Sequence, residues 1–394
     1  MADTRDVDKQ IKEICKNIDQ TNKIQELLNK FNSDESEGIE ECIDILFGVF
    51  SFHILKGTWL NSTKGFGDVV EENEGRENEP NTAKEMVHFW LSTNFESFLL
   101  MLCEKINISP PAMQCKLFET YLKLVNFEHE NGVLKAKYMT RLEKIMLKMM
   151  FFKLSDEMDA FFKEIMENLD IQYVFLKAVP NFCLQEEFTS NIVAAENCLK
   201  FFHSAVANKI DVKEDEATLY FSQDDKKMRK NFARVYEEAW LSYLRLKLTP
   251  VLRKKILVDI DTKVMPYLSD PKELIDFLTD SYDAGGVTSL LALNGLFVLI
   301  NQHNLDYPAF YEKLYKIIDP SIFHMKYKSR FFHYIDLFLT STHLPAYLVA
   351  AFIKKFSRML LFTPTPDLMM MLTLIRNLLI RHQSTKILIH RKKV

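Results

Sequence analysis

The stretch that decides the fold is residues 290–347, which read LLALNGLFVLINQHNLDYPAFYEKLYKIIDPSIFHMKYKSRFFHYIDLFLTSTHLPAY. Aliphatic and aromatic residues recur in it every three or four positions, which is the spacing of a helix that buries one face. The helix-breaking pairs, among them Asp319-Pro320 and Leu344-Pro345, fall between the apolar runs. The stretch therefore predicts a succession of short helices joined by tight turns.

The composition extends this prediction to the rest of the chain. The 394 residues include only 10 Gly and 12 Pro, whereas these two types make up roughly 12% of an average protein. Sheet proteins need many tight turns, which draw on both residues, so their scarcity favours helices. Predicted helix pairs also recur about every 35–45 residues, the period of HEAT and armadillo units. We therefore expect an all-α fold, an irregular HEAT/armadillo-like α-α superhelix.

The predicted helices fall into two regions. Residues 1–208 form an N-terminal helical repeat region, and residues 228–394 form a second helical domain. The charged interval 209–227 between them is predicted to be a linker. Within the first region, residues 58–81 are acidic and poor in apolar side chains. Because such a segment cannot offset the entropy lost on ordering, we expect it to be a disordered loop.

The apolar period places each helix within these regions. In the first region, helices are expected at 11–31 (one or two), 39–55, 83–105, 111–127, 134–152, 155–168 and 192–208. In the second, they are expected at 228–247, 251–261, 272–282, 287–302, 307–318, 326–341, 346–361 and 367–382. Asn294-Gly295 stands inside one of these runs although both residues disfavour a helix interior. Either a close helix approach over Gly295, with Asn294 bonded to a neighbouring backbone, or a local kink would explain the pair.

Catalytic motifs are missing from the sequence. It contains no phosphate-binding GxxxxGK[ST], no HExxH and no GxSxG. The six cysteines are scattered without a CxxC pair, so buried free thiols in a reducing compartment are expected. The ten histidines stand alone in helical text. We therefore predict no enzyme, no cofactor, no metal site and no small-molecule substrate.

Two apolar stretches, 287–300 and 346–362, invite a comparison with membrane spans. A spanning helix needs about 20 apolar residues. The first stretch is shorter, and the second is interrupted by Lys354, Lys355 and Arg358. Both are therefore predicted to be buried repeat helices, and a membrane-anchored protein is kept as a further alternative.

Positive charge is concentrated at the C-terminal end. Residues 324–394 contain 12 Lys and Arg against two acids, whereas the whole chain has a net charge of −4. Lys326 and Arg330 are four residues apart, as are Lys354 and Arg358, which predicts that each pair shares a helix face. The candidate partner-binding or RNA-binding residues, termed the basic C-terminal cluster, are Lys326, Lys328, Arg330, Lys354, Lys355, Arg358, Arg376 and Arg381.

Two interpretations of this cluster are open. It could form a ridge that binds phosphates or an acidic partner, or it could be an ordinary solvated face with cations at helix C-termini. The aromatic residues interleaved with it are expected to pack in the core because they recur at helical spacing. They are Phe331, Phe332, Tyr334, Phe338 and Phe356.

Three segments carry a resemblance to a known family: AWLSYLRLKLTPVLRKKIL at 239–257, DPKELIDFLTDSYDAGG at 270–286, and the stretch 290–347 quoted above. Together they resemble the CCAAT-binding-factor domain of the nucleolar complex protein four family. The resemblance implies a non-enzymatic helical scaffold of the nucleus and nucleolus. Its expected role is small (40S) ribosomal subunit biogenesis and pre-rRNA processing within the small-subunit processome.

The same resemblance implies a partner and an alternative activity. The partner is nucleolar protein 14, with which family members form a heterodimer, and pre-rRNA is a further expected ligand. The historical name of the domain invites direct RNA or DNA binding as the alternative. Members of the family continue beyond the position of residues 389–390, so we expect this chain to be a C-terminally truncated product.

Overall fold

The computed structural model describes the chain except for residues 1–2, 17–21, 33–37, 57–82, 107, 131–134, 152–154, 205–224, 306, 308–309, 342–343 and 391–394. It divides into two compact units, residues 1–235 and 236–394. The expected disordered loop at 58–81 lies outside the described residues. So does most of the expected linker at 209–227, whose last three residues belong to a helix.

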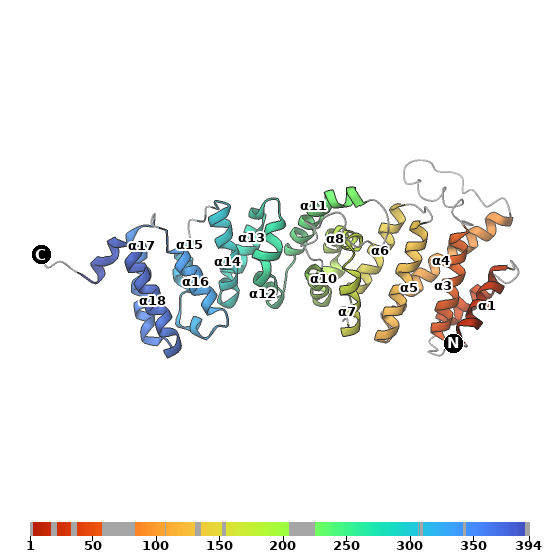
Figure 1. Ribbon diagram of the computed structural model, residues 1–394, viewed down its shortest axis with the longest axis horizontal. Coiled ribbons are helices and arrows are strands. Elements are labelled where there is room, and N and C mark those ends of the chain that lie inside the picture. The colour runs from red at the N-terminus through yellow and green to blue at the C-terminus, as the bar shows by residue number, and fades with distance from the viewer. Residues whose placement is uncertain are drawn as a thin grey trace. The chain divides into compact units, whose positions relative to one another are not determined.

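The first unit is a succession of helices (Figure 1). Its helices are α1 (Asp3–Lys16), α2 (Asn22–Asn32), α3 (Ile39–Leu55), α4 (Ala83–Ile106), α5 (Pro111–Glu130), α6 (Lys135–Met150), α7 (Asp156–Ile165), α8 (Leu169–Cys183), α9 (Glu186–Ser190) and α10 (Ile192–Ser204). Helix α11 (Asp225–Leu244) contains the point at which the two units divide.

The second unit continues with α12 (Pro250–Asp259), α13 (Ile275–Asp283), α14 (Gly286–Gln302), α15 (Phe310–Ile317), α16 (Lys328–Phe338), α17 (Ala346–Met359) and α18 (Thr365–Arg381). Shorter turns join them: the π-helix η4 (Ile260–Val264) and the 3₁₀ helices η5 (Met265–Tyr267), η6 (Pro271–Leu274), η7 (Pro320–His324), η8 (Leu360–Phe362) and η9 (Gln383–Leu388).

The starts of these helices follow from local sequence. Ser155 caps α7 by accepting a hydrogen bond from the amide of Met158, and Thr249 caps α12 by accepting one from Leu252. Pro250 then occupies the first turn, where its missing amide proton costs nothing. Asp319 accepts from the amide of Ser321 in the same way at the start of η7. The capping residues and prolines that the sequence places between the apolar runs thus lie at helix starts in the structure.

The predicted all-α class is confirmed, because every regular element in the described part of the chain is helical. Assignment to HEAT or armadillo geometry stays a prediction. Two helices were missed: α8 and α9 lie in a stretch for which the apolar period predicted nothing. Helix α8 is buried almost all round, with Asp170 and Gln172 each 1% exposed. Its exposed side is narrow, with Lys177 and Asn181 one turn apart, so the polar stripe on which the periodic signal depends is short.

The packing of α14 explains why Asn294 and Gly295 occur inside a helix. The helix runs through both residues, and a Cβ on Gly295 would lie 2.8 Å from Cδ2 of Leu278, so the predicted close approach is confirmed. The predicted partner of Asn294 is wrong. Its amide donates to the carboxylate of Asp261 at 2.6 Å and not to a backbone carbonyl.

Helices two positions apart in the chain stack on one another at the C-terminal end of the second unit. Lys328 and Asp336, near the two ends of α16, pair with Asp367 and Arg381, near the corresponding ends of α18. These two helices therefore run parallel. Tyr315 of α15 contacts Phe352 of α17 edge-on at 5.5 Å between ring centroids. The pair α17–α18 thus repeats the pair α15–α16.

The apolar stretches 287–300 and 346–362, which were compared with membrane spans, form α14 and α17 with η8 of the second unit. Across the residues that the structure describes, no helix is both long enough and apolar enough to cross a membrane.

Candidate functional site: a basic and apolar surface at the C-terminal helix pairs

Seven of the eight residues of the basic C-terminal cluster come from three helices of the second unit. Lys328 and Arg330 lie in the first turn of α16, whereas Lys326 precedes that helix. The prediction that Lys326 and Arg330 share a helix face is therefore wrong, because α16 begins only at Lys328. Lys354, Lys355 and Arg358 belong to α17, and Arg376 and Arg381 belong to α18.

Three of the eight cations are held by carboxylates. Lys328 Nζ lies 2.7 Å from Asp367, and Arg330 lies 3.0 Å from Asp261. Both terminal nitrogens of Arg381 donate hydrogen bonds to the Asp336 carboxylate, at 2.6 and 3.1 Å. The forked geometry of that last pair makes it the most specific of the three. These side chains join helices to one another and are not free to bind a phosphate.

A fourth cation, Lys355, is also engaged. Its ammonium lies 4.1 Å from the centre of the Tyr315 ring and donates a hydrogen bond to the Tyr315 carbonyl. Burial lowers the pKa of Lys355 because the charged form loses solvation, although Asp319 opposes this effect. Lys355 therefore belongs to the contact between α15 and α17.

The remaining four cations are Lys326, Lys354, Arg358 and Arg376, and all are exposed. None of them forms an ion pair with the residues that the structure describes. Lys354 and Arg358 follow one another by a single turn of α17, so they do share a helix face, as predicted. Four of the five interleaved aromatics, Phe331, Phe332, Phe338 and Phe356, are buried, which confirms that they are core residues. The prediction is wrong for Tyr334, which is only half-buried and whose ring centre lies 6.0 Å from the Arg330 guanidinium.

Exposed apolar side chains accompany these free cations, and the sequence reading did not single them out. Tyr347 on α17 is 76% exposed, Leu361 in η8 is 82% exposed and Met369 on α18 is 69% exposed. One pattern in the sequence could have revealed these exposed apolar residues: the apolar positions are too many for a single helix face. Residues 368–380 place apolar side chains on more than one face of α18, and only one face can pack against the preceding helices.

The acids of α16 and α18 at this end of the chain are engaged in ion pairs: Asp336 with Arg381 and Asp367 with Lys328. Among the described residues from 337 to 390, the only acid is Asp367, which is 7% exposed and bound to Lys328. The surface of α17 and α18 therefore combines apolar side chains with uncompensated positive charge. Such a surface can bind a macromolecule.

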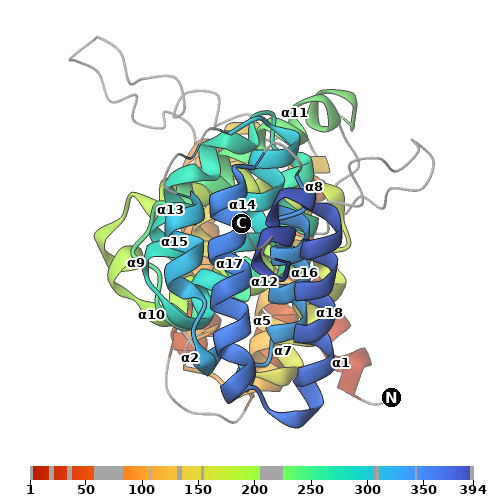
Figure 2. The same cartoon turned by 90° about the vertical axis from the view of Figure 1, so that its left-hand side faces the viewer.

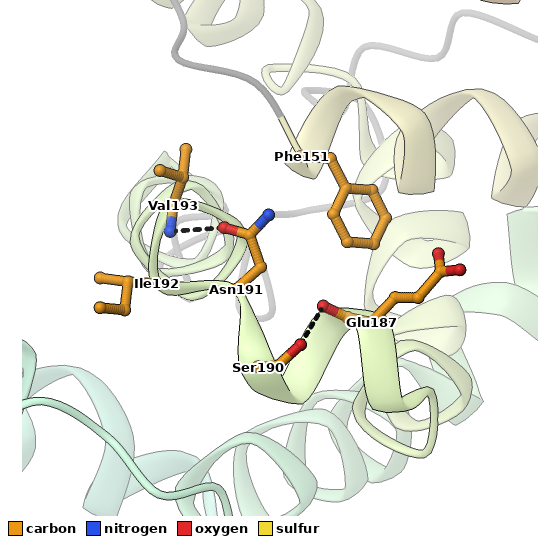
Figure 3. A pocket seen from close by; sticks show the side chains of 6 residues that line it. All are labelled: Phe151, Glu187, Ser190, Asn191, Ile192 and Val193. Carbon is orange, nitrogen blue, oxygen red and sulfur yellow. Dashed lines mark hydrogen bonds between the residues drawn. The ribbon is translucent and has the colours of Figure 1, made fainter.

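A shallow depression of about 450 Å³ lies in the first unit, at the junction of α9 and α10 (Figure 3). It is lined by Phe151, Glu187, Ser190, Asn191, Ile192 and Val193. Asn191 is occupied in capping α10, since its side-chain oxygen accepts from the amide of Val193 at 2.9 Å. The Ser190 hydroxyl donates to a carbonyl of its own helix. The Asn191 oxygen and the Ser190 hydroxyl at this depression are thus engaged in local structure.

The thiols and histidines give no reactive centre either. All six cysteines are free, and burial raises the pKa of Cys103 to about 11 and that of Cys183 to about 12. Thiols with such values remain protonated at neutral pH and are poor nucleophiles. In the described ranges, no three His, Cys, Asp or Glu side chains converge as metal ligands would.

Comparison with known proteins adds to this geometry. Residues 289–394 match the CBF/Mak21 family. The chain is 32% identical over 409 residues to Nucleolar complex protein 4 homolog A of Xenopus laevis, an alignment that covers 99% of this chain and 76% of that protein. It is 34% identical to Nucleolar complex protein 4 homolog of Mus musculus, over 94% of this chain and 74% of the relative. Against Nucleolar complex protein 4 homolog of Homo sapiens, the identity is 54% over 41% of this chain and 31% of the relative.

Proposed function

The chain belongs to the nucleolar complex protein 4 family, and from that premise we propose that it is a nucleolar, non-enzymatic scaffold of ribosome biogenesis. The observation that carries this proposal is the alignment with the Xenopus laevis relative, which extends over 99% of the chain. It therefore includes both helical units and not only the C-terminal family match at 289–394.

The finer proposal concerns the assembly in which the scaffold acts. The chain works in small (40S) subunit biogenesis and pre-rRNA processing, as a heterodimer with nucleolar protein 14 in the small-subunit processome. Exposed apolar side chains on α17 and α18 support a protein-docking role, because contiguous exposed apolar surface on a folded chain marks interaction sites.

Affinity purification tests this proposal. The tagged chain is recovered from nuclear extract with and without RNase, and its companions are quantified by mass spectrometry. We expect nucleolar protein 14 in equal amount to the tagged chain in both samples. Recovery of small-subunit factors only in the sample without RNase would mean that RNA, and not a direct protein contact, holds the chain in the particle.

A second candidate function is direct binding of RNA or DNA. The observation in its favour is the exposure of Lys326, Lys354, Arg358 and Arg376 without carboxylate partners in the described structure. The test is binding of the full chain to a single-stranded RNA over a range of salt concentrations. If phosphate contacts carry the affinity, it falls steeply with salt, and Lys354→Glu with Arg358→Glu flattens the dependence. A salt-independent affinity would exclude this function.

A further inference from the structure

A group of exposed cations lies where α11 passes into α12, at the start of the second unit (Figure 1). Between residues 239 and 258 the chain contains five Lys and Arg and no acid. One of the five, Arg253, lies over the Phe277 ring of α13, 5.7 Å from its centroid, and so faces the interior of the unit. The other four, termed the basic turn, are Arg245, Lys247, Lys254 and Lys255, and all are exposed.

The packing beneath the basic turn fixes its backbone. Leu244 and Leu248 enclose the connection between the two helices, and each is only 8% exposed, so the connection is anchored in the core at both ends. The Thr249 hydroxyl then accepts from the amide of Leu252, which starts α12 directly after the connection. The cations of the connection are therefore presented by a packed and hydrogen-bonded backbone.

On α12 the two lysines of the basic turn lie on the solvent side of the helix. Lys254 and Lys255 follow the exposed Val251 by three and four residues, which places all three on one side. The opposite side, where α12 packs on α14, holds the buried residues Leu252, Ile256 and Leu257. The positive charge of α12 is therefore directed outward.

None of the four cations has a carboxylate or hydrogen-bond partner among the described residues. The neighbouring acids are engaged elsewhere. Asp259 Oδ2 lies 2.9 Å from Lys263 Nζ, and the Glu237 carboxylate accepts hydrogen bonds from the amide and the hydroxyl of Ser269. The basic turn thus carries positive charge that its surroundings do not offset.

We infer that the basic turn binds the phosphate backbone of double-helical RNA. Unpartnered ammonium and guanidinium groups bind backbone phosphates, and such contacts position a protein on a nucleic acid without reading its bases. Stacking on the bases of a single strand needs exposed aromatic side chains, and residues 245–258 contain no aromatic residue. The basic turn therefore fits a duplex, whose bases are already stacked and paired.

An acidic protein fits the basic turn less well. Protein interfaces are centred on aromatic or aliphatic anchors that become buried. Among residues 239–259, the one large apolar side chain that is strongly exposed is Val251, at 58%. A single valine provides little apolar area, whereas charge alone is enough to bind a phosphate backbone.

The basic turn is separate from the basic C-terminal cluster. Helices α14 and α16 lie between α12 and α18 along the second unit (Figure 1). Seen from the C-terminal end, α17 and α18 are nearest the viewer and α12 lies behind them (Figure 2). The basic turn also precedes the part of the chain, 289–394, that matches the CBF/Mak21 family. The two groups of cations can therefore be altered independently.

The test measures binding of the purified full chain to a labelled RNA duplex of about 20 base pairs, long enough for a protein that spans successive grooves. Fluorescence anisotropy gives the affinity at salt concentrations from about 50 to 200 mM. The affinity should fall steeply with salt, because binding releases the counterions condensed on the phosphates. Lys254→Gln with Lys255→Gln should weaken binding about tenfold and reduce the slope of log affinity against log salt by about two. Arg245→Gln with Lys247→Gln should do the same.

The matched control is Lys354→Gln with Arg358→Gln on α17, which removes the same charge from two other exposed positions. It should leave the slope unchanged and the affinity within about twofold of the wild type. All of the substituted side chains are exposed, so none of the changes should disturb the fold.

Several results would overturn the inference. An unchanged slope in Lys254→Gln with Lys255→Gln would remove the basic turn from the contact. An equal loss in the control would favour the second candidate function, which places binding on the basic C-terminal cluster. Tighter binding of oligo-uridine, of a DNA duplex or of oligo-glutamate than of the RNA duplex would identify a different ligand.

The choice of RNA over DNA rests on the proposed function, since it takes the chain to act in ribosome biogenesis. Failure of that function has a different signature. It would appear as the absence of nucleolar protein 14 and of small-subunit factors from the wild-type purification, whatever the duplex measurements give.

Discussion

Asn294 Nδ2 donates to Asp261 Oδ2 over 2.6 Å, and Arg330 donates to the same oxygen over 3.0 Å. Asp261 stands on the π-helical turn η4, directly after α12. One carboxylate thereby connects three elements that follow one another through the second unit: the end of α12, the middle of α14 and the start of α16. The carboxylate is mostly shielded from water, with a side-chain exposure of 16%, and its two donors replace the lost hydration at Oδ2, whereas the buried Oδ1 has no hydrogen-bond partner in the described structure.

Asn294→Ala should lower the free energy of unfolding by about 1–3 kcal/mol, the usual range for a hydrogen bond to a charged group. The alanine removes a donor and leaves the shielded carboxylate short of a partner. Urea unfolding of the full chain measures the effect. Asn377→Ala on α18 is the control, because no hydrogen bond of the Asn377 side chain is described. Equal midpoints for the two variants would refute the role of Asn294.

Gly295→Ala should also destabilise the chain, by about 1–3 kcal/mol, the cost of overpacking a core. The new Cβ would lie 2.8 Å from Cδ2 of Leu278 and 3.1 Å from Cε of Met265. Trimming the obstacle should restore stability, so Leu278→Ala is expected to cost less in the Gly295→Ala background than alone. A double-mutant cycle measures this coupling. Strictly additive effects would show that the two positions do not touch.

Lys328→Ala should destabilise the chain more than Lys354→Ala, although both remove a lysine from the same cluster. Loss of Lys328 leaves Asp367, whose side chain is 10% exposed, without its cation, at a cost of about 1–3 kcal/mol. Loss of the exposed Lys354 should change stability by less than about 0.5 kcal/mol. Urea midpoints compare the two directly. The opposite ranking would contradict the division of the cluster into structural and free cations.

Stability should fall as the pH is lowered from about 6.5 toward 4 because of His53. Burial, followed by the charges of Lys56 and His88, lowers the pKa of His53 to about 4 in the folded chain. Above about pH 6.5 both states hold a neutral imidazole. Between the two values the unfolded chain binds the proton and the folded chain does not, so the unfolded state gains. His53→Gln should reduce the difference in unfolding free energy between pH 7 and pH 5, and an unchanged difference would exclude His53 as its source.

The sequence predicted the helices of the second unit well because most of them are amphipathic. Helix α17, for example, buries Val349, Phe352 and Phe356 while Lys354 and Arg358 face solvent. Helix α8 could not be found in this way. Its polar residues Asp170 and Gln172 are themselves buried, so only Lys177 and Asn181 mark the exposed face.

The basic C-terminal cluster was visible in the sequence. The sequence did not show which of its cations pair with carboxylates and which stay exposed. Asp261 is 69 residues from Arg330, Asp336 is 45 from Arg381, and Asp367 is 39 from Lys328. Pairings across such separations depend on how helices stack, which no local pattern records. For the same reason, the sequence showed that α18 is apolar on several sides without showing which side stays uncovered.

The parallel stacking of α16 and α18 has a consequence for how the C-terminal end opens. Ion pairs join the two helices at both ends, and α18 also buries Met371, Leu374 and Leu378. The attachment of α18 to α16 therefore has an electrostatic part beside its apolar contacts. Since salt screens partly exposed charges, rising ionic strength should speed amide hydrogen exchange in α18 before α14. The ionic environment would then set how readily α18 separates from α16.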